Sequence, residues 1–214
     1  MVFYKFGKDK IQEVKSPTFS EAGITERDDL QRLLKDKIEV ISPETLIISE
    51  EFSSWQDSKR RVDLLGIDKN LNLIVIELKR TEDGGHMDLQ AIRYAAMVSP
   101  LGFDKALGIY GEYLRKNEKE GDPEGDPKEK IFEFLRKNGL KDFEEDEIVE
   151  RFGKEVKIIL ASADFSTEIT TTVIWLNTTY GLDIKCVKLK LYEDQGNLFL
   201  EAQQIIPLPE AEEY

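Results

Sequence analysis

The sequence has few of the residues on which several common chemistries depend. It contains one cysteine, Cys186, and one histidine, His86, among 214 residues. A single cysteine cannot form an internal disulfide, which favours a cytoplasmic location. One residue of each kind also argues against a zinc site built from Cys and His, and against a Cys–His nucleophilic pair. Catalytic groups are therefore expected among carboxylates, lysines and hydroxyls.

Long apolar runs are missing as well. Runs such as Leu73–Ile76 fall far short of the roughly 20 residues that a membrane-spanning helix needs. The first ten residues, MVFYKFGKDK, contain no apolar segment of the kind found in secretory signals. We therefore expect neither a membrane span nor export. With 40% hydrophobic and 34% charged residues, the composition is typical of a soluble globular protein.

Basic residues are outnumbered, with 30 lysines and arginines against 43 acids and a net charge of −13. This balance argues against a protein that coats nucleic acid or a membrane surface, since both usually carry a basic excess. The acids are uneven, however: residues 112–155 hold fifteen acidic and ten basic side chains. Lys59–Arg61 and Lys79–Arg80 are local basic islands. The sequence is therefore still compatible with an acidic protein that has a basic cleft.

The first half of the chain predicts an arm, a helix and three strands. The first twenty residues favour an edge strand or arm. A helix is expected from Thr25, with Asp28 completing an approximate capping box. Strands are expected over 45–52, 61–68 and 72–79, and a short polar turn at 69–71 joins the last two into a β-hairpin.

The second half predicts helices over 87–98 and 103–114, a polar loop over 117–130, and one or two surface helices within 131–152. A buried strand at 156–166, a helix at 168–179 and a closing hairpin of 183–193 with 197–206 follow. The fold class is therefore α/β, a mixed central β-sheet flanked by helices. We expect one domain over 1–214, with a core of about 20–116, an acidic helical insert of about 117–155 and C-terminal strands and helix over about 156–214.

The hairpin brings charged residues together. If its turn centres on Asn70, Asp63 lies opposite Glu77 and Arg61 lies opposite Lys79, with Cβ atoms of opposed residues about 4.5–5.5 Å apart. Because side chains alternate between the faces of a strand, these charges share a face with aliphatic residues. Charged groups on such a face are unfavourable unless they are paired or bind a metal.

Two adjacent carboxylates repel each other unless a cation neutralises them. Oxygen ligands select Mg²⁺ or Mn²⁺ rather than zinc. A lysine one pleat away can offset charge on a phosphate group. The cluster therefore suits metal-assisted hydrolysis of a phosphodiester bond.

These residues also resemble those of a known family. Asp63, the triplet Glu77-Leu78-Lys79 and the segment Gln90-Ala91-Ile92-Arg93-Tyr94 are similar to the motifs of the PD-(D/E)xK nuclease superfamily, which has a restriction-endonuclease-like core. The glutamine–tyrosine motif resembles its RecB-like branch, and the segments VDLLGID and LIVIELKR resemble NucS-type endonucleases. The resemblance covers about residues 24–98. One departure is Val62, where many members have proline.

The resemblance implies a role for each matching position. Asp63, Glu77 and the backbone carbonyl of Leu78 would bind Mg²⁺ or Mn²⁺, and Lys79 would be the catalytic lysine. Further site residues would be Gln90 and Tyr94 on the following helix and Glu26 on the first helix. The implied activity is a metal-dependent endonuclease that cuts DNA in repair or restriction, with RNA as an alternative substrate. A homodimer is expected, because a duplex has two strands to cut.

Several alternatives stay open. Asp63 and Lys79 could form a structural ion pair between strands, and Glu26 could simply favour the start of its helix. Arg61 could bind a phosphate or balance two acids. Either Glu50 or Glu51 could face the site. The whole chain could be a catalytically silent nuclease-fold module that binds nucleic acid or a partner protein.

Two further expectations concern the surface and the core. Nucleic acid would need a locally positive or neutral rim, and the candidates are Lys59, Arg60, Arg61, Lys79, Arg80 and Arg93. Cys186 is expected to be a small buried residue. Trp175 is expected to be a core aromatic, and Trp55 to lie at the end of a strand.

Overall fold

A six-stranded mixed sheet forms the centre of the computed structural model, which describes residues 2–53, 61–81, 87–117 and 125–208. Its order is β3 (Thr45–Phe52), β4 (Val62–Asp68), β5 (Leu73–Lys79), β6 (Val156–Ser162), β7 (Ile184–Asp194) and β8 (Asn197–Ile206). Strands β5, β6 and β7 run parallel, and the remaining neighbours are antiparallel. The predicted fold class, a mixed sheet with flanking helices, is confirmed.

The central strands are buried on both faces, which explains their nearly continuous apolar sequences. Leu65 and Val75 belong to one hydrophobic cluster, whereas Leu64 and Ile76 belong to the cluster on the other face. Since successive side chains alternate, one strand supplies both clusters. The sheet is therefore the shared wall of two cores.

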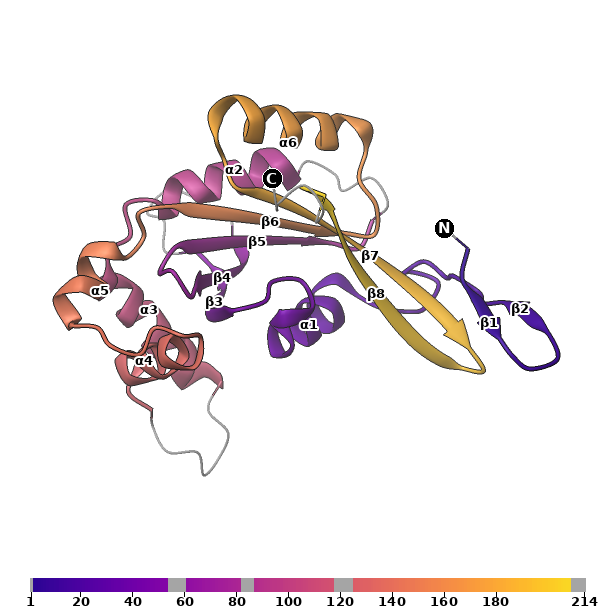
Figure 1. Cartoon of the computed structure of the whole chain (residues 1–214), viewed down its shortest axis with the longest axis horizontal. Helices are drawn as coiled ribbons and strands as arrows, with labels where there is room; N and C mark the ends of the chain where they lie inside the picture. The colour runs from indigo at the N-terminus through magenta and orange to yellow at the C-terminus, as the bar shows by residue number, and fades with distance from the viewer. Residues whose placement is uncertain (1, 54–60, 82–86, 118–124, 209–214) are drawn as a thin grey trace.

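Helices cover both faces of the sheet. They are η1 (Glu26–Gln31), α1 (Arg32–Asp36), η2 (Ile38–Val40), α2 (Met87–Val98), α3 (Phe103–Asn117), α4 (Pro127–Lys137), α5 (Glu145–Arg151) and α6 (Thr167–Tyr180). Figure 1 shows α2 and α6 on one side of the sheet, α1 on the other, and α3, α4 and α5 grouped at one end. Within the described residues, no helix is both long and apolar enough to cross a membrane.

The structure corrects the predicted boundaries of the loop at 117–130. Helix α3 runs to Asn117, and α4 already begins at Pro127. The Asp126 side chain caps α4 by accepting a hydrogen bond from the Lys128 N–H at 2.9 Å. The Asp-Pro pair is thus a helix start, because proline is well suited to the first helical position. Residues 118–124 lie outside the described part.

The first helix also begins differently from the predicted capping box. Its first six residues form a π-helix, in which the Leu30 N–H donates to the Thr25 carbonyl at 3.1 Å. In this wider turn Asp29, rather than Asp28, reaches back and accepts from the Thr25 N–H and hydroxyl, both at 2.8 Å. The start at Thr25 is confirmed, and the capping partner is one residue further along.

The N-terminal segment forms a two-stranded sheet of its own, β1 (Tyr4–Phe6) with β2 (Ile11–Glu13). An isolated bridge between Lys15 and Glu193 attaches it to the end of β7, which extends with β8 away from the helices (Figure 1). Lys5 forms an ion pair with Asp194 at 2.6 Å. The predicted arm is therefore an appendage of the closing hairpin.

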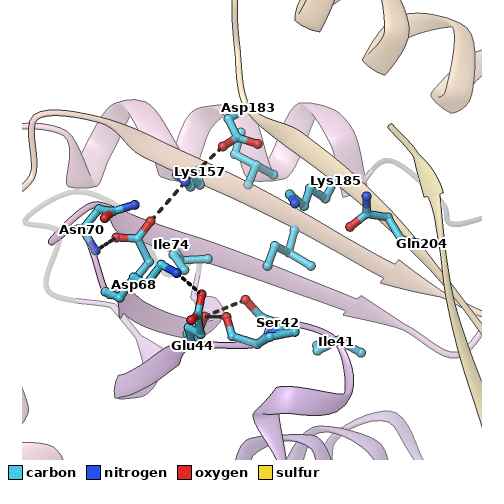
Figure 2. Close-up of a pocket in the computed structure, with 15 residues that line it drawn as sticks. Ile41, Ser42, Glu44, Asp68, Asn70, Ile74, Lys157, Asp183, Lys185 and Gln204 are labelled. Carbon is cyan, nitrogen blue, oxygen red and sulfur yellow. Dashed lines mark hydrogen bonds and ion pairs between the residues drawn. The ribbon is translucent and has the colours of Figure 1, made fainter. Parts of the chain in front are cut away.

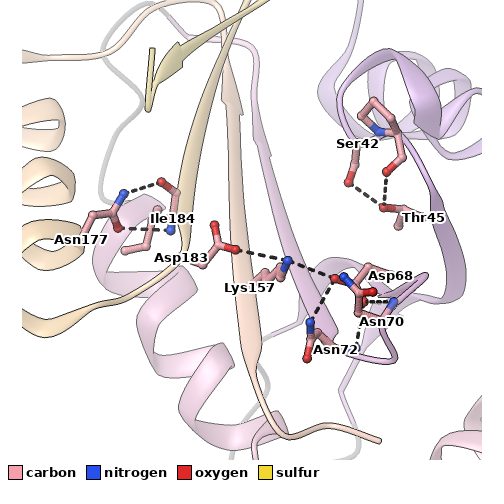
Figure 3. A network of polar contacts seen from close by, with 10 residues as sticks. Ser42, Thr45, Asp68, Asn70, Asn72, Lys157, Asn177, Asp183 and Ile184 are labelled. Atoms are coloured by element: carbon pink, nitrogen blue, oxygen red, sulfur yellow. Dashed lines mark hydrogen bonds and ion pairs between the residues drawn. The ribbon is translucent and has the colours of Figure 1, made fainter. Parts of the chain in front are cut away.

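The end of the β4–β5 hairpin opposite the charged cluster is held by a polar network. The Asp68 carboxylate accepts from the backbone N–H groups of Asn70 and Asn72 at 2.8 and 2.9 Å. Lys157 of β6 lies 3.1 Å from Asp68 and 3.3 Å from Asp183, as Figure 3 shows. This network borders a cavity of about 180 Å³ (Figure 2). Asp68, Lys157 and Asp183 already contact one another. The network therefore attaches the β4–β5 turn to β6 and to the start of β7.

Candidate active site

The β4–β5 register brings the predicted carboxylates together. Leu64 pairs with Ile76 and Leu65 with Val75, which is the register expected from a turn centred on Asn70. Continued by one residue, it places Asp63 next to Glu77. The Asp63 Oδ2 atom accepts a hydrogen bond from the Leu78 backbone N–H at 2.8 Å. The two acids thus meet at the end of the hairpin, close to the backbone of Leu78.

Glu77 is the most unusual residue of the pair. Its side chain is fully buried, and within the described part of the chain neither carboxylate oxygen has a hydrogen-bond partner. A buried carboxylate without partners is strongly unfavourable, and nearly all buried polar groups in proteins are paired. Two buried carboxyl oxygens without a protein partner are groups that a water molecule or a cation could satisfy.

Burial and mutual repulsion shift the pKa of both acids. Burial raises the pKa of Asp63 to about 6, against the opposing effects of Lys79 and the Leu78 N–H. Burial, followed by the charge of Asp63, raises the pKa of Glu77 to about 9. The Asp63 N–H lowers the Glu77 pKa somewhat without reaching hydrogen-bonding geometry. Without a cation, Glu77 would therefore hold a proton at neutral pH.

The donor set fits a hard divalent cation. Carboxylate oxygens are the ligands that Mg²⁺ and Mn²⁺ prefer, and a cation would satisfy the oxygens of Glu77 that have no partner. Among the described residues, no group of three or more His, Cys, Asp or Glu side chains is placed to hold a metal ion. A cation bound by Asp63 and Glu77 would therefore need backbone oxygens or water as its further ligands.

Lys79 lies beside the carboxylates and is held by the first helix. Its Nζ atom is 3.3 Å from Glu26 Oε1, and Glu26 Oε2 accepts from the Arg80 backbone N–H at 3.0 Å. Although burial lowers the pKa of Lys79, the carboxylates of Asp63, Glu26 and Glu77 raise it above its ordinary value. Lys79 is therefore a fixed cation, and the structure brings Glu26 to the site as predicted.

Helix α2 supplies Gln90 and Tyr94. Gln90 Nε2 donates to the Tyr94 hydroxyl at 3.1 Å, and the Tyr94 side chain is only 1% exposed. The pKa of Tyr94 is raised, mainly by burial and further by the charges of Glu77 and Asp63, against hydrogen bonds with Gln90 and the Arg61 backbone. Tyr94 is thus a neutral phenol near the carboxylates of Glu77 and Asp63.

The structure describes only some of the residues of the predicted basic rim. Arg80 and Arg93 are exposed, and Arg80 Nη1 donates to the Ile24 carbonyl at 3.5 Å. Arg61 forms an ion pair at 3.4 Å with Glu51, so the acid that it balances is neither Asp63 nor Glu77. Lys59, Arg60, His86 and Trp55 lie outside the described residues.

Sequence reasoning missed a cleft beside Asp63. It is a cavity of about 490 Å³ with basic residues from three separate segments, Arg27 and Arg32, Arg61, and Lys116. Gln31 also lines it and donates to the Asp63 backbone carbonyl at 3.3 Å. These residues are far apart in the sequence, and no local pattern joins them.

The chain is similar in structure to known proteins. No protein-family model and no curated protein sequence matches it. A crystal structure of a repair endonuclease from Pyrococcus abyssi is 18% identical in sequence, with a TM-score of 0.39. The aligned region covers 74% of this chain and 45% of the endonuclease chain. The structure of an EndoMS–dsDNA2 complex is 16% identical in sequence, with a TM-score of 0.41. The aligned region covers 88% of this chain and 64% of the chain in that structure.

This chain spans less than two thirds of the length of either structure. At identities this low the similarity concerns the fold alone.

Proposed function

We propose that this protein is a metal-dependent nuclease that hydrolyses phosphodiester bonds in DNA. The observation that carries the proposal is the fully buried Glu77 carboxylate, which has no hydrogen-bond partner among the described residues and lies next to Asp63 and Lys79. A purely structural ion pair would satisfy its own oxygens. This arrangement instead leaves oxygen atoms available for a cation.

Each residue has a role that follows from its position. Asp63 and Glu77 would hold Mg²⁺ or Mn²⁺, with the Leu78 carbonyl as a further ligand. When bound, the cation would supply Lewis acidity and lower the pKa of water. Lys79 would neutralise the charge that develops on the phosphate, and its pairing with Glu26 keeps it in place. Gln90 and Tyr94 offer an amide and a neutral phenol for hydrogen bonds to water or substrate.

The test is cleavage of end-labelled single-stranded DNA, double-stranded DNA and RNA in Mn²⁺. We expect Glu77→Gln and Lys79→Ala each to lower the cleavage rate at least about a hundredfold. Lys157→Ala is a matched control, because Lys157 is also a partly buried, ion-paired lysine but lies at the far end of the hairpin. It should keep the wild-type rate below its melting temperature.

Two results would contradict the proposal. One is DNA cleavage that survives Glu77→Gln and Lys79→Ala unchanged, which would assign the activity to a contaminant or another site. The other is a folded wild-type protein that cleaves none of the three substrates and binds no Mn²⁺. The latter would favour the silent nuclease-fold module.

A further inference from the structure

Two arginines share one carboxylate oxygen at the mouth of the cleft beside Asp63. Arg27 Nη2 and Arg61 Nη1 both lie 3.4 Å from Glu51 Oε2. The two arginine side chains are 63% and 52% exposed. Tight arginine–carboxylate hydrogen bonds are about 2.7–2.9 Å long, so both contacts are loose. The carboxylate holds two guanidinium groups together without binding either one closely.

The Glu51 backbone is unusual as well. Its φ of 51° lies in the left-handed region, which non-glycine residues seldom adopt. The neighbouring Glu50 side chain instead pairs with Lys35 at 2.8 Å. Of the two glutamates that could have faced the site, Glu51 is therefore the one at the cleft between the arginines.

The cleft is a basic region in an acidic protein. Four cationic side chains line it, and they come from Arg27, Arg32, Arg61 and Lys116. Of its acids, Glu50 is paired with Lys35, which leaves Asp28 and Glu51. Of its cations, Arg32 is paired with Asp29 at 3.9 Å, which leaves Arg27, Arg61 and Lys116. The cleft is thus locally positive although the chain has a net charge of −13. Removing the Glu51 carboxylate from the arginines would leave two adjacent guanidinium groups facing a cavity of about 490 Å³.

We propose that Arg27 and Arg61 bind a backbone phosphate of the nucleic acid next to the one that is cut, and that Glu51 occupies the place of this phosphate in the free protein. Guanidinium groups suit this ligand because their planar forks match the oxygens of a phosphate. Arg61 lies two residues before Asp63, and Gln31 connects the cleft to the Asp63 backbone. The identity of the ligand rests on the proposed nuclease function.

The test is a fluorescence-anisotropy titration of labelled single-stranded and duplex oligonucleotides in Ca²⁺, across a series of salt concentrations. Each lost phosphate contact lowers the salt slope of log K by about 0.7 on single strands and about 0.9 on duplex. Because both arginines bind the same phosphate, the double substitution Arg27→Gln, Arg61→Gln should therefore weaken binding of a single strand roughly fivefold in 0.1 M salt.

Glu51→Gln separates this proposal from a structural role for the ion pairs. If Glu51 competes with the phosphate, Glu51→Gln should tighten binding about two- to fivefold, since exposed ion pairs are individually weak. The gain should vanish in the Arg27→Gln, Arg61→Gln background. Arg136→Gln and Glu129→Gln are matched controls, because Arg136 and Glu129 form an exposed ion pair on α4. They should leave binding unchanged.

The outcomes for the two proposals differ. If the wild type cleaves DNA but the double arginine variant keeps its affinity and kcat/KM, the phosphate site is wrong and the nuclease function stands. If no cleavage occurs but binding responds to Arg27, Arg61 and Glu51 as described, the phosphate site stands and the catalytic proposal fails. Weaker binding in Glu51→Gln, with an unchanged melting temperature, would overturn the phosphate site directly. Because Glu51→Gln is tested alone, this result does not depend on the folding of the double variant.

Discussion

Glu77 is unfavourable for the fold as a buried carboxyl group without a hydrogen-bond partner among the described residues, and in the proposed function it would be a metal ligand. Valine or isoleucine at this position would extend the apolar face formed by Leu65 and Val75. The protein instead buries a carboxyl group that keeps a proton at neutral pH, because its pKa is raised to about 9. Such perturbed groups are concentrated at functional sites. A cation that displaces this proton would turn an unfavourable residue into a ligand.

This view predicts how the stability of the metal-free protein depends on pH. A raised pKa means that folding makes Glu77 take up a proton, so its stabilising contribution is complete below the ordinary glutamate pKa of 4.5 and is lost as the pH rises towards about 9. Glu77→Gln removes this titration. Between these pH values we expect the unfolding free energy of the wild type to fall, relative to the variant, by up to about 1.4 kcal/mol per pH unit.

The measurement is chemical denaturation of both proteins in EDTA at pH 5, 6.5 and 8. Asp63 titrates in the lower part of the same range in both proteins, so the difference between them isolates Glu77. A constant difference across the three pH values would show that Glu77 does not gain a proton on folding.

At the scale of elements, the β4–β5 hairpin is the feature that could be predicted best from the sequence. The sequences of its two strands are largely apolar, which predicts buried strands. Its polar turn at 69–71 fixes the register that pairs Leu64 with Ile76. A correct register places Asp63 beside Glu77 without further information. Helix α2 was equally predictable, because the spacing of Gln90 and Tyr94 puts both side chains on one face.

Other features could not be predicted because they depend on contacts between distant segments. The cleft joins Arg27, Arg61 and Lys116, which only the folded chain brings together. Trp175, expected in the core, is 52% exposed and lies edge-on to Tyr180 on the outer side of α6. Its helical spacing did not reveal which face of α6 meets the sheet. Cys186, in contrast, is fully buried as expected, because its strand is central.

The far end of the hairpin yields a prediction about stability alone. Asp68 is 8% exposed and accepts hydrogen bonds from the turn and from Asn72, and it also forms an ion pair with Lys157. Asp68→Ala leaves the N–H groups of the turn and of Asn72 without this acceptor and removes one of the two carboxylates paired with Lys157, so we expect a loss of about 2–4 kcal/mol in unfolding free energy. Asp183→Ala removes the more exposed partner of Lys157 and should lower stability by less than about 1 kcal/mol.

Thermal denaturation gives both values, and cleavage assays below the lower melting temperature give the activity. Because Asp68 and the carboxylate pair occupy opposite ends of the β4–β5 hairpin, Asp68→Ala should not change the cleavage rate of folded protein. A large loss of rate with little loss of stability would instead place Asp68 in the functional site.

At the scale of the whole molecule, the candidate site and the hydrophobic core are built on the same two strands. Both hydrophobic clusters use β4 and β5, and these strands also carry Asp63, Glu77 and Lys79. Anything that stabilises the end of this hairpin should therefore stabilise the sheet as a unit. This coupling allows cation binding to be measured through the melting temperature of the whole chain, without any nuclease substrate.

We therefore expect Mn²⁺ to raise the melting temperature, and more strongly at pH 8 than at pH 6. Ligands bind a cation only after they lose their protons, and the pKa values of about 6 for Asp63 and about 9 for Glu77 make this loss easier as the pH rises. At a hundredfold excess over its Kd, a ligand stabilises the folded state by about 2.7 kcal/mol, which corresponds to roughly 5–10 °C for a domain of this size. The double variant Asp63→Asn, Glu77→Gln should show no shift at either pH, whereas Asp183→Ala should keep it. A shift that persists in the double variant would locate the cation elsewhere, and a larger shift at pH 6 would contradict proton release from Glu77.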